Sequence, residues 1–567
     1  MDTIQSPDGT PTKTYPAAGR SVLGLLFLLP ALFCCLAQLL LPTLSTFLMS
    51  FQKVDVLGSK KEFVGLENYA GLFDYEMFWQ ATGFTLLTLL VRLLVVAIVP
   101  LLLAWAVAQF GARLRLGLRV LFMLPFALFA PVAIAVTWLM FLNPNNGFLP
   151  FEKSWAASPA SARSTLLFID ALYLAGLAVS LGQMIYLPLW RRAAGTAQPT
   201  FREVSKPMLA VWAVGILGVI ILSLSTFVLS FTLTRGGPVG STNTLGLMMY
   251  QLGFVRFQMG PGASIASLIL LVTLLLGIAA GLLVILTRLR LDLVDTKPAS
   301  EEGSQPVSSK GNLVLPPLLV VLVLGACLLG ALPFGWLVPQ AVGGNGSERL
   351  PQELSAGRLF VNSLTPPLIS ATLQIVIAYL AALGIGALRP LGKRSEWLLL
   401  LFSPWLFIST LPLSLVNFLR AREAHTLDSL AGSVSPLLLS VPALFVLTIF
   451  FAGRVSRRGT AAGGSTDAPD LFKQVILPSL PLTAVLWLVL AFVNGQDVLW
   501  SLLISSSPEN YNVNLILLQL VGMFGADQKV LATAITSFIL PVRLLFFVCL
   551  ALFQVFYLDR LTLYSEE

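Results

Sequence analysis

Long apolar runs alternate with short polar segments along nearly the whole chain. Most of these runs exceed the ~18 residues that a helix needs to cross a bilayer core of about 30 Å. The pattern therefore predicts an all-α polytopic membrane protein with about twelve transmembrane helices. The expected spans are residues 21–50, 82–109, 118–142, 164–190, 209–232, 263–287, 313–340, 362–388, 396–420, 430–453, 480–504 and 529–557.

One polar interval in the interior is longer than the others. Residues 292–312 read DLVDTKPASEEGSQPVSSKGN, and this content of Pro, Ser and charged residues is typical of a linker. The interval separates six expected spans from six. We predict an N-terminal tail at 1–20, a first transmembrane domain at 21–290, a linker at 291–312 and a second transmembrane domain at 313–560.

Composition supports a membrane location. The chain is 56% hydrophobic and only 11% charged, whereas soluble domains carry roughly 25% charged residues. With the N-terminus inside, 21 of the 35 Lys and Arg residues fall in inner segments and 12 in outer segments. The positive-inside rule then places both termini in the cytoplasm of a bacterial or archaeal cell, and it explains the net charge of +8 without nucleic acid.

Metal and nucleotide sites are not expected in this chain. The single histidine, His425, lies in an expected outer loop, and the four cysteines lie in apolar runs without zinc spacing. No Gly-x4-Gly-Lys-Ser/Thr phosphate loop occurs, so we expect no cofactor here and no ATP hydrolysis by this chain. We therefore predict that it is not an enzyme.

Several segments that include the polar stretches between apolar runs carry a specific sequence pattern. In the first half these are GLENYAGLF at 65–73, LRVLFMLPFALFAPVAIAVTWLMFLNPNNGFLP at 118–150 and LTRGGPVGSTNTLGLMMYQLGFVRFQMGPGASIAS at 233–267. In the second half they are RLFVNSL at 358–364, LFKQVILPSLPL at 471–482 and FVNGQDVLWSLLI at 492–504. The first set resembles one permease subunit of binding-protein-dependent ABC importers of the maltose and glycerol-3-phosphate type, and the second resembles its partner subunit. The chain thus resembles a type I importer permease with both subunits fused.

The resemblance implies partners. A dimer of ATPase subunits is expected on the inner face, and it would bind ATP and magnesium. An external or periplasmic solute-binding protein would deliver a small polar solute, expected to be a sugar. The outer stretch that begins at Gly236, Gly237 and Pro238 would then lie near the site where that protein docks.

Five residues are candidates for the substrate path. Charged groups are costly within a membrane and are rarely placed there without a role. Asp497, with Gln496 and Asn494, lies about 26 Å along its span at 1.5 Å per residue, near the outer leaflet. Phe227 and Ser230 in the fifth span offer an aromatic face and a hydroxyl. The alternatives are an interfacial position for Asp497 and Gln496, and helix packing for the other candidates.

Three further charges lie near or within the expected spans. Arg92 and Arg543 are expected to pair with an acid or a carbonyl of the bundle rather than with solute. Asp170 is ambiguous between a structural partner and a contact to the path.

The expected coupling loops depart from the family pattern. Such permeases carry a Glu-Ala-Ala-x3-Gly motif upstream of a Leu-Pro pair. In this chain the segment at the position of that motif has no acidic residue and is basic instead. The alternative to ATPase docking is that these basic residues only set the membrane topology. The candidate coupling residues are Arg191, Arg192, Gly195, Phe201, Pro207, Gly463, Phe472 and Pro478.

Two other functional classes stay open at this point. A secondary active transporter of a small polar solute also suits two halves of similar size. A membrane-embedded enzyme would need paired carboxylates, histidines or a metal site near one water layer, and the sequence offers none.

Overall fold

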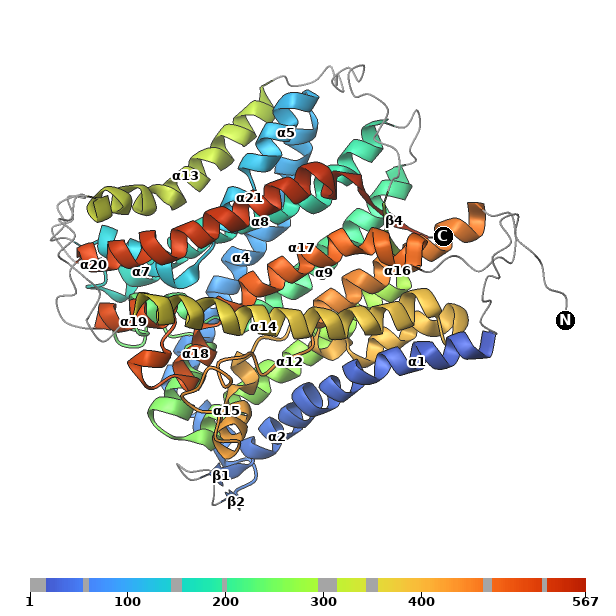
Figure 1. Cartoon of the computed structure of the whole chain (residues 1–567). Helices are drawn as coiled ribbons and strands as arrows, with labels where there is room; N and C mark the ends of the chain where they lie inside the picture. The colour runs from blue at the N-terminus through green and yellow to red at the C-terminus, as the bar shows by residue number, and fades with distance from the viewer. Residues whose placement is uncertain are drawn as a thin grey trace.

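The computed structural model describes residues 17–54, 61–143, 155–195, 201–293, 314–342, 355–461, 472–522 and 528–566. Within these residues the protein is an all-α polytopic bundle with two small two-stranded sheets (Figure 1). We call residues 17–293 the first half and residues 314–566 the second half. Both ends of the described chain lie at the same end of the bundle.

The first half contains the elements that follow. They are α1 (Ala17–Cys34), the π-helical η1 (Cys35–Leu40), α2 (Leu41–Ser50), β1 (Gln52–Val54), β2 (Lys61–Phe63), α3 (Glu67–Phe73), α4 (Glu76–Ala108), α5 (Ala112–Leu121), α6 (Leu124–Ala127), α7 (Pro131–Phe141), α8 (Pro159–Gly195), α9 (Phe201–Leu224), α10 (Val228–Leu233), α11 (Leu245–Tyr250), η3 (Gln251–Val255), α12 (Met259–Leu286) and β3 (Leu289–Leu293).

The second half repeats much of this order. It contains α13 (Leu315–Val342), α14 (Ala356–Ala382), η5 (Leu383–Leu388), η6 (Gly392–Leu401), η7 (Ser403–Trp405), η8 (Leu411–Leu413), α15 (Ser414–Glu423), α16 (Val441–Ala461), η9 (Phe472–Ile476), α17 (Leu477–Asn494), α18 (Val498–Ile504), η10 (Pro508–Asn510), α19 (Val513–Gly522), α20 (Gln528–Ala534), η11 (Ile535–Ile539), α21 (Leu540–Phe556), η12 (Leu558–Arg560) and β4 (Leu561–Ser565).

The expected spans agree with the structure at most positions. Within the described residues, nine helices are long and apolar enough to cross a membrane, and they match nine of the expected spans. The third expected span is instead a pair of helical segments, 112–127 and 131–141, bent by 84°. The ninth and tenth expected spans do not appear as long helices, so the count of twelve is not confirmed.

Prolines account for these departures. Residues 396–420 form only short 3₁₀ segments and the ten-residue helix α15, and Pro404 and Pro412 lie within this stretch. Proline removes a backbone donor and its ring clashes with the preceding turn, which favours a break in this stretch, although α14 continues through Pro366 and Pro367. Pro436 similarly precedes α16, which begins only at Val441 and is shorter than the tenth predicted span required. Pro131 occupies the first position of α7 at the bend.

The order of elements recurs between the two halves. Each has a 33-residue span, Glu76–Ala108 or Ala356–Leu388, followed by a broken segment and another helix. Next come a helix, a three-residue break and a short helix, α9 to α10 in one half and α17 to α18 in the other. A short helix, a final long span and a single strand then close each half. The halves therefore share one architecture.

The first helix of each half packs against the other half. Helix α1 lies along α14 and η5, and α13 lies along α4 and α8 (Figure 1). The α1 crossing is close, because a Cβ added at Gly384 would lie 2.6 Å from the carbonyl oxygen of Gly24. The largest buried apolar cluster combines α1 and α12 of the first half with α14 and α16 of the second. The two halves consequently share a core.

Side chains from other segments complete the backbone hydrogen bonds at the helix breaks. Ser180 accepts from the Phe126 amide at 3.2 Å and donates to the Phe122 carbonyl at 2.5 Å, between α5 and α6. Thr244 donates to the Thr226 carbonyl at 2.6 Å, between α9 and α10. Since buried backbone groups without a partner are costly, these contacts allow the helices to break inside the bundle.

Strands β3 and β4 join the ends of the two halves. They pair antiparallel, with Leu291 opposite Leu563. The predicted linker at 291–312 therefore begins inside β3, and its remainder lies outside the described residues. The predicted tail at 1–20 likewise overlaps α1, which begins at Ala17.

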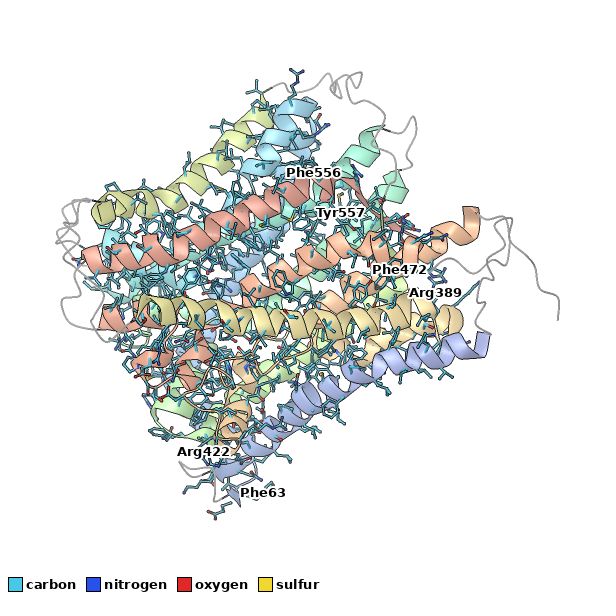
Figure 2. The ribbon with its side chains drawn as sticks, viewed as in Figure 1. Phe63, Arg389, Arg422, Phe472, Phe556 and Tyr557 are labelled. Atoms are coloured by element: carbon cyan, nitrogen blue, oxygen red, sulfur yellow. The ribbon has the colours of Figure 1, made fainter. Side chains whose placement is uncertain are left out.

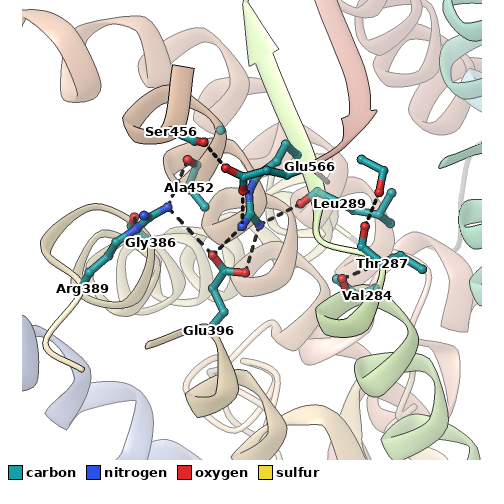
Figure 3. Close-up of polar contacts among 12 residues, drawn as sticks. Val284, Thr287, Leu289, Gly386, Arg389, Glu396, Ala452, Ser456 and Glu566 are labelled. Carbon is teal, nitrogen blue, oxygen red and sulfur yellow. Dashed lines mark hydrogen bonds and ion pairs between the residues drawn. The ribbon is translucent and has the colours of Figure 1, made fainter. Parts of the chain in front are cut away.

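A partly buried ionic network lies beside this sheet (Figure 3). Arg290 bridges Glu396 and Glu566, each at 2.8 Å, and Arg389 lies 3.9 Å from Glu396. The pKa of the Glu566 carboxyl is lowered: burial opposes its ionisation, but the hydrogen bond from Ser456 and the charge of Arg290 outweigh that effect. The carboxylate of Glu566, at the end of the second half, is thus paired with Arg290 of the first half.

A second ion pair crosses between the halves behind the sheet. Asp292 of β3 lies 3.2 Å from Arg454 of α16, and their side chains are 1% and 5% exposed. We expect Asp292→Asn to lower the free energy of unfolding by about 3 kcal/mol, because it leaves a buried cation without its partner. Chemical denaturation in detergent micelles measures this change.

An exposed pair provides the control for this prediction. Arg358 and Glu509 form an ion pair whose side chains are 63% and 67% exposed. Glu509→Gln is expected to cost less than about 1 kcal/mol, as exposed pairs do. An Asp292→Asn protein as stable as the Glu509→Gln protein would contradict the assignment of this pair as a buried link between the halves.

Candidate functional site

The break between α17 and α18 forms the floor of a polar pocket. Helix α17 ends at Asn494 and α18 begins at Val498, so three residues lie between them. Asp497 caps α18, because its carboxylate accepts from the Trp500 amide at 3.1 Å. The Thr410 hydroxyl, from the irregular ninth segment, also hydrogen-bonds this carboxylate. The carboxyl group of Asp497 thus lies where two broken segments meet.

We call the cavity above this break the α17–α18 pocket. Its volume is about 430 Å³, a figure that includes the open solvent at its mouth. Most of its lining side chains carry a hydroxyl, an amide or a carboxylate. The lining residues are Asn362, Pro366, Pro367, Ser370, Ser433, Ser435, Asn494, Gly495, Asp497, Trp500, Ser501, Ser505, Asn510 and Asn512. Such a lining suits a neutral or hydroxylated solute.

Hydrogen bonds fix the orientation of the amides at the pocket wall. Asn494 donates to the side-chain oxygen of Gln374 at 2.8 Å. Gln374 in turn donates to the Leu437 carbonyl at 2.7 Å. The Ser370 hydroxyl accepts from the Ser435 amide at 2.9 Å. Helices α14 and α17 and the segment before α16 are held together by these contacts, so the wall is preorganised.

A carboxylate clamp supports the outer rim of the pocket. Asp428 accepts hydrogen bonds from the amides of Ser506 and Ser507 at 3.0 and 2.9 Å, and the Ser507 hydroxyl donates to the same carboxylate. The side-chain amide of Asn510 donates to the Asp428 carbonyl at 2.7 Å. These bonds, led by that from the Ser507 hydroxyl, lower the pKa of Asp428 to about 2.

The five path candidates do not all meet in one place. Asn494 and Asp497 line the α17–α18 pocket. Gln496 lies in the same break, but its amide donates to the Phe492 carbonyl at 3.3 Å and it is not among the lining residues. Phe227 and Ser230 belong to the corresponding break and short helix of the first half, outside the pocket.

The first-half break is packed rather than open. Phe227 is buried and stacks on Phe231, with ring centroids 4.9 Å apart. Tyr250 closes this group edge-on, at 5.2 Å from Phe227. Ser230 is buried, and its carbonyl accepts from the Thr234 hydroxyl. A role for Phe227 and Ser230 in the path stays a prediction.

An ion pair secures the first-half break. Arg92 of α4 makes two hydrogen bonds to Asp170 of α8, at 2.7 and 2.6 Å, and a third to the Thr226 hydroxyl at 2.9 Å. The expectation that Arg92 pairs with an acid of the bundle is confirmed. Asp170, ambiguous in the sequence, is its partner.

Several pocket residues were not singled out from the sequence. Ser433, Ser435, Asn510 and Asn512 lie in the stretches GSVSP and SSSPENYNVN, whose Ser and Asn content was the available signal. One stretch had been placed inside the tenth expected span and the other in an outer loop. Their approach to Asp497 depends on how these segments fold over the helices, which periodicity does not describe.

The described coupling candidates lie at the end of the bundle that carries the chain termini. Phe472 is 61% exposed there (Figure 2). Pro478 is the second residue of helix α17, and its carbonyl accepts from the Tyr557 hydroxyl at 3.0 Å. Pro207 is buried within α9. The side chains of Arg191, Arg192, Gly195 and Phe201, and the whole of Gly463, lie outside the described part of the chain.

The described residues contain no group of three or more His, Cys, Asp or Glu side chains that could hold a metal ion.

Comparison of the sequence with known proteins finds similarity to transport permeases. The chain is 27% identical over 277 residues to the "Probable ABC transporter permease protein" of Pyrococcus horikoshii, which covers 44% of this chain and 91% of that protein. It is also 27% identical over 248 residues to the sn-glycerol-3-phosphate transport system permease protein UgpA of Salmonella typhimurium, covering 40% and 82%. No protein-family model matches the chain.

A third relative has similar coverage. The trehalose/maltose transport system permease protein MalF of Thermococcus litoralis is 27% identical over 275 residues, covering 44% of this chain and 90% of the relative. Each of these relatives thus accounts for less than half of the chain, while the chain spans most of each relative. Together with the apolar helices, these similarities support a multi-pass transport permease of the ABC importer type.

The clamp at the pocket rim generates a pH-dependence prediction. Because the pKa of Asp428 in the folded protein is about 2, below the usual ~4, its stabilising contribution is complete above pH ~4 and is lost as the pH falls towards 2. Asp428→Asn should therefore remove part of the fall in unfolding temperature between pH 4 and pH 2. Thermal unfolding in detergent, followed by intrinsic fluorescence, measures it.

Asp74 provides the matched control, since its side chain is exposed and accepts no hydrogen bond from the described residues. Asp74→Asn is expected to keep the wild-type pH dependence. Equal pH dependence in Asp428→Asn and wild type would show that the clamp does not contribute.

Proposed function

We propose that this chain is the whole membrane permease of an ATP-driven, binding-protein-dependent importer, with two permease subunits joined in one polypeptide. The observation that carries the proposal is the repeated order of elements in the two halves. It is supported by the coverage of the relatives, which match 40–44% of this chain at 82–91% of their own lengths. The proposed domains are residues 21–290 and 313–560, with the linker at 291–312 between them.

The proposed solute is a small polar molecule of the sugar class. Hydroxylated solutes are recognised by amides, hydroxyls and carboxylates at fixed positions, and the α17–α18 pocket presents all three. The names of two relatives, for sn-glycerol-3-phosphate and for trehalose/maltose transport, point to the same class. We propose that Asn494 and Asp497, with Gln496, lie along the path, and that Phe227 and Ser230 line it from the first half in another conformation.

The proposed orientation places the end of the bundle with β3 and β4 in the cytoplasm. The excess of Lys and Arg in the segments at that end supports it. A dimer of ATPase subunits, which binds ATP and magnesium, would dock there on the exposed Phe472 and the segments preceding α9 and α17. The α17–α18 pocket would then open towards the external solute-binding protein. In this proposal the chain itself performs no catalysis.

Reconstitution tests the proposed function. The tagged chain should co-purify with its ATPase subunits, and vesicles containing the complex should hydrolyse ATP faster when the solute-loaded binding protein is added. The chain alone should hydrolyse no ATP. Uptake that persists with an inactive ATPase and collapses with an uncoupler would instead establish a secondary transporter.

The pocket carboxylate generates a second test. Asn at position 497 can still accept from the Trp500 amide, so Asp497→Asn should fold and insert normally. Loss of a charge-assisted hydrogen bond to a solute hydroxyl should reduce uptake by about tenfold. Uptake per molecule of inserted protein measures the effect, with Asp74→Asn as the matched control. Wild-type uptake by Asp497→Asn would remove this carboxylate from the path.

A further inference from the structure

Arg543 lies at the centre of a membrane span. The last long helix runs from Val530 to Phe556, and Arg543 is its middle residue, about 20 Å from either end at 1.5 Å per residue. No arginine side chain is long enough to bring its charge to the membrane surface from that position. A cation at this depth is expensive and is expected to have a function.

The guanidinium points into the protein and away from lipid. Phe546 and Leu550 lie three and seven residues further along α21, on the same face of the helix, and both are buried. The exposed residues Leu545 and Val548 lie on the opposite face. Arg543 nevertheless keeps some exposed surface on this inward face.

Aromatic rings from both halves surround this position. The guanidinium carbon lies 4.3 Å from the centre of the Phe492 ring. Phe492 stacks on Phe546 with centroids 4.3 Å apart, and Phe126 of the first half lies 5.2 Å from Phe492. Arg543 consequently lies at the junction of the two halves, where a path between them would run.

Arg543 differs from the other cation within a span. Arg92 has two hydrogen bonds to Asp170 and one to Thr226. Among the described residues, Arg543 has neither an ion pair nor a hydrogen bond, so the expectation that it pairs with an acid or a carbonyl is wrong there; its guanidinium lies over the ring of Phe492. The five N–H donors of its guanidinium are therefore available to a ligand.

We propose that Arg543 is an anion-binding subsite of the solute path, and that the transported solute is a hydroxylated molecule bearing a carboxylate or phosphate. A guanidinium binds either group through two parallel hydrogen bonds, and a dry aromatic surrounding strengthens them. Asn494, at the pocket floor, is only two residues from Phe492 along α17. One solute moving past this helix would thus meet hydroxyl-binding groups and the cation at similar depth.

This inference rests on the proposed transport function and specifies its substrate class. It is tested with the purified chain in nanodiscs of phosphatidylcholine, which carries no net charge. The probes are two matched pairs, galacturonate with galactose and sn-glycerol 3-phosphate with glycerol, at equal ionic strength. At least one anionic probe should raise the unfolding temperature more than its neutral partner does.

Variants assign the effect to the guanidinium. Arg543→Gln should weaken binding of the anionic probe by about tenfold or more and leave the neutral probes unchanged. Arg543→Lys should retain part of the preference, because it keeps the charge. Arg256→Gln, which removes an exposed arginine that donates to Tyr75, should behave as wild type. If Arg543→Gln proves unstable, the Lys variant and the wild-type comparison of each pair still decide the outcome.

Three results would overturn the inference. One is wild-type protein that does not distinguish either anionic probe from its neutral partner. The second is an anion preference that survives in Arg543→Gln. The third is a preference that disappears when phosphatidylglycerol is added to the nanodiscs, since a lipid phosphate would then occupy the site. Any of these results, found together with ATP-dependent uptake of a neutral sugar by the wild-type protein, would reject the anion subsite and leave the proposed transport function intact.

Discussion

The bilayer core offers no water to a backbone amide or carbonyl, so a membrane helix can break only where other protein groups complete its hydrogen bonds. This constraint explains where the irregular segments of the protein lie. Ser180 completes the break between α5 and α6, Thr244 that between α9 and α10, and Asp497 that between α17 and α18. Each break is buried among other helices, and the α17–α18 break also lines a polar pocket. Structural irregularity and candidate function coincide for this physical reason.

The sequence predicted the regular helices better than the breaks. Hydropathy reflects the side chains, and it located nine spans, eight of them within six residues of their observed ends; the eleventh, expected at 480–504, lies at 472–494. Hydropathy does not detect that Pro404 and Pro412 lack a backbone N–H donor. The apolar stretch 396–420 was therefore predicted to be a ninth helix. Asp497 stood out because a charge in an apolar run is costly. Ser435 and Asn512 did not, since their place in the pocket depends on segments far apart in sequence.

At the junction of the two halves, each half contributes elements that pack against the other. Helices α1 and α13 each lie on the opposite half, β3 pairs with β4, and Asp292 of one half neutralises Arg454 of the other. These contacts hold together the end of the bundle that we propose to be cytoplasmic. The aromatic cluster around Arg543 lies deeper in the protein, at the same junction. A single chain with two such repeats is expected to fill both permease positions of one importer.

The stoichiometry of the assembled transporter tests the fused permease most directly. Native mass spectrometry of the complex purified through a tag on this chain is predicted to find one copy of the chain with two ATPase subunits. Two copies of the chain in one complex, or one copy together with a separate permease subunit, would contradict it.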